Sequence, residues 1–435
     1  MRKMRDSGIA WIGVIPQDWE IVRTKSLYCS AKEIAGDRAD DFERLALTLN
    51  GVIKRSKEDS VGLQPEKFSG YQILKKGELV FKLIDLENVA TSRVGLSPYT
   101  GIVSPAYIVL SKQSRAKDLV VRYSMYHFLS MWQREIFNQM GDNGVRSSLN
   151  AKELLNIPHP FPSIYEQKRI VTFLDAQCAE IDAVLEKTRA SIEEYKKLKQ
   201  AVITQAVTKG IRGDRPMKDS RIEWIGEIPE SWEVSSVRYI GQLQNGISKG
   251  GEFFGKGFPF VSYGDVYKNY ELPHSVSGLI DTTEDERATY SVEYGDIFFT
   301  RTSETIEEVG FSCVCKRSIP NATFAGFIIR LRPFCADEKI LTDYAKYYFR
   351  GEHIRAYLVK EMNLVTRASL GQTLLKGMSV IVPPKSVQKE IAEYLDDKCA
   401  DIDALVAKKQ QYLTEIENYK KSLIYEYVTG KKEVI

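Results

Sequence analysis

The stretch "EQKRIVTFLDAQCAEIDAVLEK" (Glu166–Lys187) occurs a second time as "VQKEIAEYLDDKCADIDALVAK" (Val387–Lys408). In both copies the apolar residues alternate at spacings of three and four, which is typical of the seam between two coiled helices. The seam residues that we expect are Leu174, Cys178, Ile181 and Leu185 in the first copy and Leu395, Cys399, Ile402 and Val406 in the second. Each predicted helix runs about 40 residues, or about 60 Å. A helix of that length with one apolar stripe needs a partner, and its own twin can supply one.

The repetition extends over the whole chain of 435 residues. Near the start, "WIGVIPQDWE" (Trp11–Glu20) returns as "WIGEIPESWE" (Trp224–Glu233). In the middle, "GELVF" parallels "GDIFF", and "VRSSL" parallels "TRASL"; these segments are Gly77–Phe81, Gly295–Phe299, Val145–Leu149 and Thr366–Leu370. The copies lie more than 200 residues apart, which is too long a period for a solenoid. The sequence therefore indicates a duplicated unit that consists of one domain and one long helix.

Helix stop and start signals set the predicted boundaries. The proline-rich "IPHPFPS" (Ile157–Ser163) cannot continue a helix. Ser163 lies three residues before Glu166 in the spacing of a capping box, and Gly210 and Gly430 stand where helix C-caps are expected. The predicted parts are a first domain over 1–162, a long helix over 163–210, a second domain over 211–385 and a second long helix over 386–435.

Each domain is predicted to be mixed α/β. Strand patterns with turn glycines come first, and an amphipathic helix follows, over Val120–Met140 in the first half and Leu341–Met362 in the second. The fold class that we expect is therefore two mixed α/β domains separated by an antiparallel coiled coil of two long helices. The duplication relates the halves by a pseudo-two-fold axis.

Composition and motifs do not favour a catalytic or metal site. The formal net charge is +3, and neither a signal-peptide core nor a membrane-spanning apolar run is present, so we expect a cytoplasmic protein. "GGEFFGKG" (Gly250–Gly257) has the spacing of a phosphate-binding loop, but Gly257 stands where Ser or Thr would hold magnesium. The four histidines are isolated in sequence, and the six cysteines have no ligand or disulfide spacing.

The doubled "WIG.IP..WE" and the doubled "QK.I...LD..C..ID" resemble the specificity subunits of type I restriction–modification systems. The resemblance implies two target recognition domains, each of which reads one half of a split site in double-stranded DNA. It also implies partners, namely two methyltransferase (modification) subunits and two motor/nuclease (restriction) subunits. S-adenosylmethionine, ATP and Mg²⁺ would belong to those partners, so that this chain is a non-catalytic subunit without a cofactor of its own.

The two half-sites of such a target differ, so we expect the base-reading residues in polar loops that the two halves do not share. In the first half these are Lys54, Arg55, Lys57, Asn88, Ser92 and Arg93. In the second half they are Ser248, Lys249, Tyr263, Lys268, Asn269, Arg301, Thr302 and Ser303. The shared "R.SL" residues Arg146, Ser148, Arg367 and Ser369 suit either phosphate contacts or a structural turn.

Several alternatives stay open at this point. A coiled-coil adaptor with two protein-binding heads would have the same architecture, and an enzyme that uses the Gly250–Gly257 loop would bind nucleotide. The repeated tryptophan motif either anchors each domain on the helix end beside it or also shapes a docking surface for the methyltransferase subunits.

Overall fold

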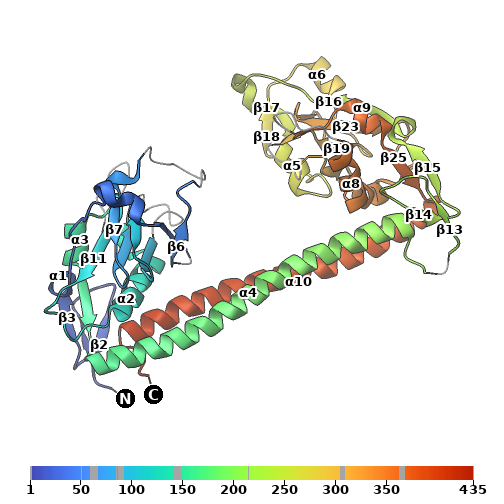
Figure 1. Ribbon diagram of the computed structural model, residues 1–435. Coiled ribbons are helices and arrows are strands. Elements are labelled where there is room, and N and C mark those ends of the chain that lie inside the picture. The colour runs from blue at the N-terminus through green and yellow to red at the C-terminus, as the bar shows by residue number, and fades with distance from the viewer. Residues whose placement is uncertain are drawn as a thin grey trace. The chain divides into compact units, whose positions relative to one another are not determined.

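The computed structural model describes residues 2–49, 51–58, 67–84, 86, 93–140, 148–213, 215–303, 309–361 and 368–434. The chain forms two compact units (Figure 1). Unit 1 comprises residues 1–189 and 411–435, and unit 2 comprises residues 190–410. Two long helices, α4 (Ile164–Lys209) and α10 (Lys385–Val428), each have one part in unit 1 and the other part in unit 2.

Unit 1 is a mixed α/β body. Within its described residues, two four-stranded sheets have the orders β6-β5-β10-β7 and β4-β11-β8-β9. Their strands are β4 (Tyr28–Cys29), β5 (Arg44–Thr48), β6 (Gly51–Arg55), β7 (Gln72–Leu74), β8 (Leu79–Lys82), β9 (Arg93–Leu96), β10 (Gly101–Val103) and β11 (Ile108–Lys112). The remaining elements are β1 (Met4–Asp6), β2 (Val14–Pro16), β3 (Glu20–Arg23), β12 (Pro158–Phe161), α1 (Thr24–Leu27), α2 (Val121–Gln133) and α3 (Ala151–Asn156).

Unit 2 has the same kind of construction. Its described sheets include β16-β23-β19-β21 and β18-β17-β22. The strands are β13 (Met217–Asp219), β14 (Glu227–Pro229), β15 (Glu233–Ser236), β16 (Gly241–Asn245), β17 (Phe254–Val261), β18 (Gly278–Ile280), β19 (Ile297–Thr300), β20 (Thr302–Ser303), β21 (Ser312–Val314), β22 (Thr323–Phe324), β23 (Ile328–Pro333), β24 (Ala368–Ser369) and β25 (Ser379–Val382). The helices are α5 (Tyr263–Lys268), α6 (Glu284–Thr289), α7 (Thr342–Tyr348), α8 (Glu352–Glu361) and α9 (Gln372–Gly377).

The two units repeat one topology. In unit 1 strand β11 pairs antiparallel with β8 and β4, and in unit 2 strand β23 pairs antiparallel with β19 and β16. A parallel pair recurs as well, β5 with β10 and β17 with β22. The matched segments "GELVF" and "GDIFF" end in the equivalent buried strands β8 and β19. The prediction of two mixed α/β domains built by duplication is confirmed.

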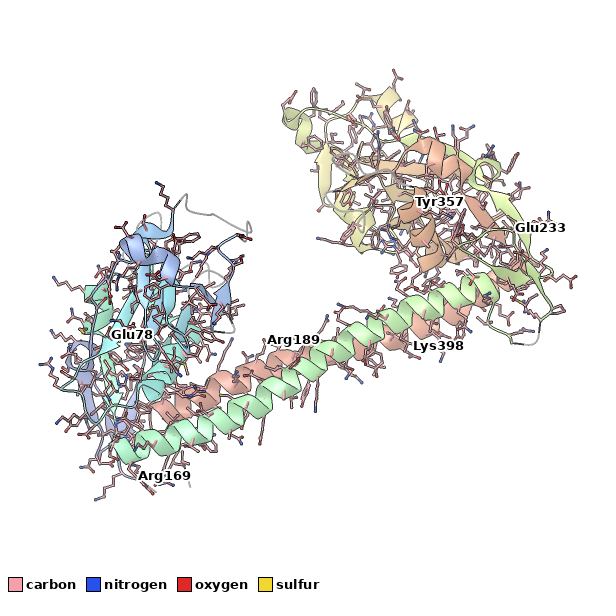
Figure 2. All side chains as sticks on the ribbon, in the orientation of Figure 1. Glu78, Arg169, Arg189, Glu233, Tyr357 and Lys398 are labelled. Atoms are coloured by element: carbon pink, nitrogen blue, oxygen red, sulfur yellow. The ribbon has the colours of Figure 1, made fainter. Side chains whose placement is uncertain are left out.

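The two long helices pair antiparallel within each unit. In unit 1, Asp182 binds Lys420 and Arg189 binds Glu417, each at 2.6 Å, so residue numbers rise on α4 as they fall on α10. Figure 2 labels Arg189, which projects from α4. In unit 2, Lys199 binds Asp403 at 2.6 Å and Arg212, just past the end of α4, binds Glu390 at 2.5 Å, so the numbers again run in opposite directions. The predicted coiled coil of the two helices is therefore present.

The expected seam residues lie along this contact. Leu174, Cys178, Leu185, Leu395, Cys399 and Ile402 are buried, whereas Ile181 and Val406 are partly buried. In unit 1, Leu174 and Cys178 pack in one core with Leu423 and Ile424 of α10. None of the helices in the described part of the chain combines the length and apolar character that a bilayer crossing requires.

Two predicted helices are shorter than their apolar periodicity indicates. The segment Val120–Met140 forms α2 only as far as Gln133, because Glu135 takes a left-handed backbone conformation with φ of 57°. The segment Leu341–Met362 is interrupted between α7 and α8. At this interruption the Arg350 guanidinium donates to the carbonyl oxygens of Ser312 (2.6 Å) and Asn269 (2.6 Å), which ties the break to the sheet.

Candidate nucleic-acid interface

The repeated glutamine of each long helix holds the neighbouring domain in place. In unit 1, Val120 N donates to Gln167 Oε1 (2.9 Å), and Gln167 Nε2 donates to Pro162 O (2.8 Å). In unit 2, Leu341 N donates to Gln388 Oε1 (2.7 Å), and Gln388 Nε2 donates to Pro383 O (2.8 Å). Both side chains are buried. In each unit one side-chain amide therefore binds both a backbone N–H at the start of a domain helix and a proline carbonyl just before the long helix.

The repeated aspartate has an equivalent role. Tyr126 donates its hydroxyl to Asp175 (2.6 Å) in unit 1, and Tyr347 donates to Asp396 (2.8 Å) in unit 2. A cation reinforces each contact, Arg122 in unit 1 and Lys346 in unit 2. Burial alone would raise the pKa of Asp396, but the hydrogen bonds from Lys346 and Tyr347 lower that pKa below its ordinary value. These shared residues support the fold, so they do not distinguish two half-sites.

The repeated tryptophan motif packs against a helix C-terminus in each unit. Trp19 is buried beside Gly430, and Trp232 is buried beside Gly210. Both glycines have a positive φ, +68° and +80°, as the predicted C-caps require. A Cβ at Gly430 would lie 3.0 Å from the Trp19 ring. The anchoring role predicted for the motif is confirmed by these contacts.

The predicted capping box at the start of α4 is only half formed. Glu166 N donates to Ser163 Oγ at 3.3 Å. The Glu166 carboxylate instead accepts from the Trp19 indole nitrogen (2.9 Å) and from Arg2. The Glu166 side chain, which in a complete capping box would accept from the backbone of Ser163, thus links the first tryptophan motif to α4.

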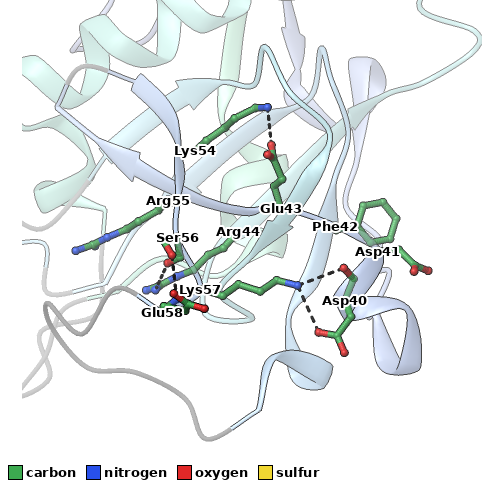
Figure 3. Close-up of a pocket in the computed structure, with 10 residues that line it drawn as sticks. All are labelled: Asp40, Asp41, Phe42, Glu43, Arg44, Lys54, Arg55, Ser56, Lys57 and Glu58. Atoms are coloured by element: carbon green, nitrogen blue, oxygen red, sulfur yellow. Dashed lines mark hydrogen bonds and ion pairs between the residues drawn. The ribbon is translucent and has the colours of Figure 1, made fainter.

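Three of the candidate residues of unit 1 gather around an open pocket of about 590 Å³ (Figure 3). Lys54, Arg55 and Lys57 line it beside several carboxylates. Lys54 binds Glu43 at 2.6 Å, and Lys57 donates to the carbonyl oxygen of Ala39 at 2.9 Å. The basic residues that the sequence proposes as DNA contacts therefore already have partners within the domain.

The pocket also holds a residue that sequence reasoning missed. Arg44, on β5, is only 7% exposed, and it donates to Ser56 O at 3.3 Å while its guanidinium lies over the Phe68 ring. No described acidic residue pairs with it. Arg44 is the first residue of the strand "RLALT". A charged residue that is buried at such a position either has a structural hydrogen-bonding role or belongs to a functional site.

Several predicted residues lie outside the described residues, namely Asn88, Ser92, Arg146 and Arg367. Arg93 begins β9, and Ser303 ends β20, and only their backbone is described. Ser148 is exposed and forms an isolated bridge with Ile84. Their contribution to DNA contacts stays a prediction.

The candidate residues of unit 2 fall into two classes. Lys249 donates to Glu286 (2.6 Å) and to Asp281 O (2.9 Å), and Asn269 donates to Asp265 O (2.9 Å), so both are committed to internal partners. Tyr263 stacks on Tyr267 with ring centroids 5.9 Å apart. In contrast, Lys268 is exposed, and its ammonium makes no ion pair with a described residue. Their roles in DNA contact stay predictions.

Arg301 lies where several loops of unit 2 meet. Thr302 on β20 pairs with Ser369 on β24, and Leu370 N donates to Arg301 O at 2.8 Å. This pairing brings a loop specific to unit 2 beside the shared "R.SL" segment. The half-buried Arg301 guanidinium has no hydrogen bond or ion pair with any described residue. A cation without a partner among the described residues, at a loop junction, is suited to bind a phosphate or a guanine edge.

The catalytic alternatives lose their structural basis. Lys256 lies inside strand β17, which continues to Val261, so no helix begins at Gly257 and Gly250–Gly257 does not form a phosphate-binding loop at a helix N-terminus. Cys313 and Cys315 are buried, and burial raises the pKa of the Cys315 thiol to about 12. Among the described residues no cluster of metal-ligating side chains is found.

Comparison with known proteins finds similarity in both sequence and fold. Residues 229–417 match the family model described as the type I restriction modification DNA specificity domain. The MjaVIII specificity subunit of Methanocaldococcus jannaschii is 24% identical over 429 residues, which cover 97% of this chain and 94% of that protein. The EcoKI specificity subunit of Escherichia coli K12 is 24% identical over 73% of this chain and 67% of its own length.

Over nearly its whole length the chain is thus similar to specificity subunits of type I restriction enzymes. A solved structure described as the basis of complex assembly and conformational transition of the type I R-M system has the same fold. Its TM-score is 0.70 at 14% identity, over 96% of this chain and 99% of that chain. The glutamine, aspartate and tryptophan residues that both halves share make scaffold contacts, and the candidate base contacts lie in loops that differ between the halves.

Proposed function

We propose that this chain recognises a bipartite sequence in double-stranded DNA, with one half-site read by each unit. The observation that carries the proposal is the repeat itself, one scaffold used twice with different polar loops. Spaced half-sites on DNA mirror a pseudo-symmetric protein, and different loops would select different bases. The chain is a specificity subunit and leaves the catalytic steps to its partners, where S-adenosylmethionine, ATP and Mg²⁺ would bind. We place this complex in the cytoplasm.

Unit 2 supports the recognition of DNA most directly. Arg301, Thr302 and Ser369 meet at the junction of β20 and β24, and Arg301 is not neutralised by a described carboxylate. An arginine that pairs bidentately with guanine discriminates by about 1–3 kcal/mol per base pair. The pairing of β20 with β24 in the shared "R.SL" segment holds the backbone beside Arg301 in place.

The coil offers equivalent surfaces for two copies of one partner. In unit 1, Val184 on α4 and Tyr419 on α10 are 39% and 54% exposed. In unit 2, Leu198 on α4 and Leu405 on α10 are 48% and 42% exposed. The repeat relates Val184 to Leu405 and Leu198 to Tyr419. Val184 and Leu405 directly precede the seam residues Leu185 and Val406, and Leu198 and Tyr419 lie two heptads further along the same helices. In antiparallel helices residues at this heptad position share one flank.

These two apolar surfaces fit two modification subunits in the complex. The opposite flank in unit 1 carries the ion pairs Asp182–Lys420 and Arg189–Glu417, so it is already satisfied. Exposed apolar residues in matching positions are typical of a protein–protein interface. Two motor/nuclease subunits would join the complex for restriction.

Fluorescence anisotropy tests the recognition of DNA. The full chain, assembled with its modification subunit, is titrated with duplex DNA at two salt concentrations. We expect binding that weakens steeply with salt, because phosphate contacts release counterions. An adaptor that binds only proteins would show no salt-dependent DNA affinity, and that result would reject the proposal.

Native mass spectrometry tests the stoichiometry. The Val184→Glu/Tyr419→Glu chain should bind one modification subunit where the unmodified chain binds two, because one surface is charged and the other is intact. The control replaces Lys187 and Lys408, which are exposed and related by the same repeat, with glutamate. Two bound copies on the first variant would contradict the assignment of these surfaces.

A further inference from the structure

Phe327 is an exposed aromatic residue at the loop junction of unit 2. It directly precedes β23, and 64% of its surface is accessible, more than for any other phenylalanine among the described residues. A single exposed apolar residue is ordinary on a protein surface. Its surroundings make this one different, because they are polar, rigid and drawn from the candidate DNA loops.

The backbone around Phe327 is fixed from both sides. Arg301 N donates to Phe327 O at 2.8 Å, and Ala325 N donates to Val261 O at 3.1 Å. A Cβ at Gly326 would lie 2.2 Å from Ser248 Oγ, so this turn packs tightly against the loop that carries Ser248. The phenyl ring is therefore presented to solvent from a rigid base, which limits the entropy that binding would cost.

Three segments that the sequence independently proposes as DNA contacts meet at this residue. They are the Ser248 loop, the Arg301–Ser303 loop and, through the pairing of β20 with β24, the segment of Ser369. The Arg301 guanidinium beside them has no described partner. A side chain that protrudes among hydrogen-bonding loops is placed to touch whatever those loops bind.

The equivalent residue of unit 1 is arranged differently. Tyr107 precedes β11, which corresponds to β23 in the repeated sheet, yet it is half-buried and packs against the core that includes Val103 and Val109. The exposure of Phe327 is thus not a requirement of the shared fold. It belongs to unit 2, as a residue that distinguishes one half-site from the other should.

We propose that the Phe327 ring contacts the C5-methyl group of a thymine in the half-site that unit 2 reads. This inference rests on the proposed function. Phenylalanine contacts thymine methyl groups in the major groove, while arginine and hydroxyl side chains bind the polar edges of neighbouring bases. Arg301, Thr302 and Phe327 together would recognise a polar edge next to a methyl group.

The test uses the full chain in complex with its modification subunit and a duplex that carries the site found by methylation sequencing. Phe327→Ala should weaken binding about tenfold. Phe334→Ala is the matched control, because Phe334 is 63% exposed and lies past the other end of β23, about 23 Å away. We expect its affinity for DNA to equal that of the unmodified chain, and both variants should keep the unmodified melting temperature.

Replacement of single thymines by deoxyuridine, which lacks the methyl group, identifies the contact. One position should weaken binding of the unmodified chain about fourfold, the effect of one buried methyl group, and should not weaken Phe327→Ala further. Unchanged affinity of Phe327→Ala would overturn the proposal. A unit 2 half-site without an A·T pair would also overturn it. So would a loss of DNA affinity in Phe327→Ala that no deoxyuridine substitution reproduces, because that result would indicate insertion of the ring between base pairs. Failure of the unmodified complex to bind DNA at all would instead reject the proposed function.

Discussion

In unit 1 the Trp19 indole donates a hydrogen bond to Glu166, whereas in unit 2 the equivalent position is Val387 and the buried Trp232 indole nitrogen has no described partner. Both tryptophans nevertheless pack against the C-capping glycine of a long helix. The difference teaches that the duplication preserved the apolar contact and left the polar one free to vary. The two units therefore separate what the scaffold needs from what each half can change.

The aspartate contacts lead to the same conclusion. Asp175 and Asp396 both accept a tyrosine hydroxyl and both bind a cation, although that cation is Arg122 in one unit and Lys346 in the other. The tyrosine keeps its place in the repeat, but the cation does not, because the residue equivalent to Arg122 is Asp343 and the residue equivalent to Lys346 is Met125. The loops around Phe327 and Tyr107 keep neither the exposure nor the chemistry, which is what divergence toward different ligands would produce.

Removal of the tryptophans should have the largest effect. Trp19→Ala and Trp232→Ala should each lower the free energy of unfolding by about 3–5 kcal/mol, because each opens a large cavity at a domain–helix junction. Hydrogen exchange of the full chain should locate the first loss in unit 1 and the second in unit 2. A cost below about 1 kcal/mol for either would show that the two contacts are not equivalent.

Arg301→Ala should affect DNA binding in unit 2 alone. We expect cognate affinity to fall by about 1–3 kcal/mol and one position of one half-site to relax. Lys249→Ala is the matched control, because the Lys249 side chain is 14% exposed and its ammonium is already bound to Glu286, so the affinity of this variant for DNA should not change. Anisotropy with a panel of single-base variants of the site measures both. Equal losses for the two variants would contradict the distinction between uncommitted and committed cations.

Conservative replacement of the tryptophans should sharpen the comparison of their polar contacts. Trp19→Phe should cost about 1–2 kcal/mol more than Trp232→Phe, because only Trp19 donates a hydrogen bond to a carboxylate. Denaturant titration of both variants gives the difference. The gap should close when the cost of Trp19→Phe is measured in a chain that already carries Glu166→Ala, which removes the acceptor, and a gap that remains would assign the cost to packing.

Acid should weaken unit 1 more steeply than unit 2. Burial lowers the pKa of His159 from 6.5 to about 4 and that of His127 well below its ordinary value, and their rings lie 4.5 Å apart. In unit 2, burial lowers the pKa of His353 to about 3. Each histidine takes up a proton on unfolding below pH 6.5, so stability falls as pH drops from 6.5 toward 4, by up to about 1.4 kcal/mol per pH unit for each. Hydrogen exchange across this range should show protection lost faster in unit 1, and His159→Gln should reduce that difference.

The sequence predicts the duplicated α/β fold and the seam well, because apolar periodicity and repeated motifs report directly on buried faces. It does not predict the break at Arg350, since that break depends on carbonyl groups supplied by distant loops. It also treats Lys249 and Arg301 alike, although only the folded chain brings Glu286 to Lys249. Phe327 escaped notice because an apolar letter at a strand end predicts core rather than contact.

The most direct test of two equivalent, divergent halves is methylation sequencing of a host that carries this chain and its modification subunit. The account predicts a split recognition site, two dissimilar half-sites around an unspecified spacer, and it predicts that Arg301→Ala relaxes one half-site only. A continuous site, or relaxation of both halves by Arg301→Ala, would contradict it.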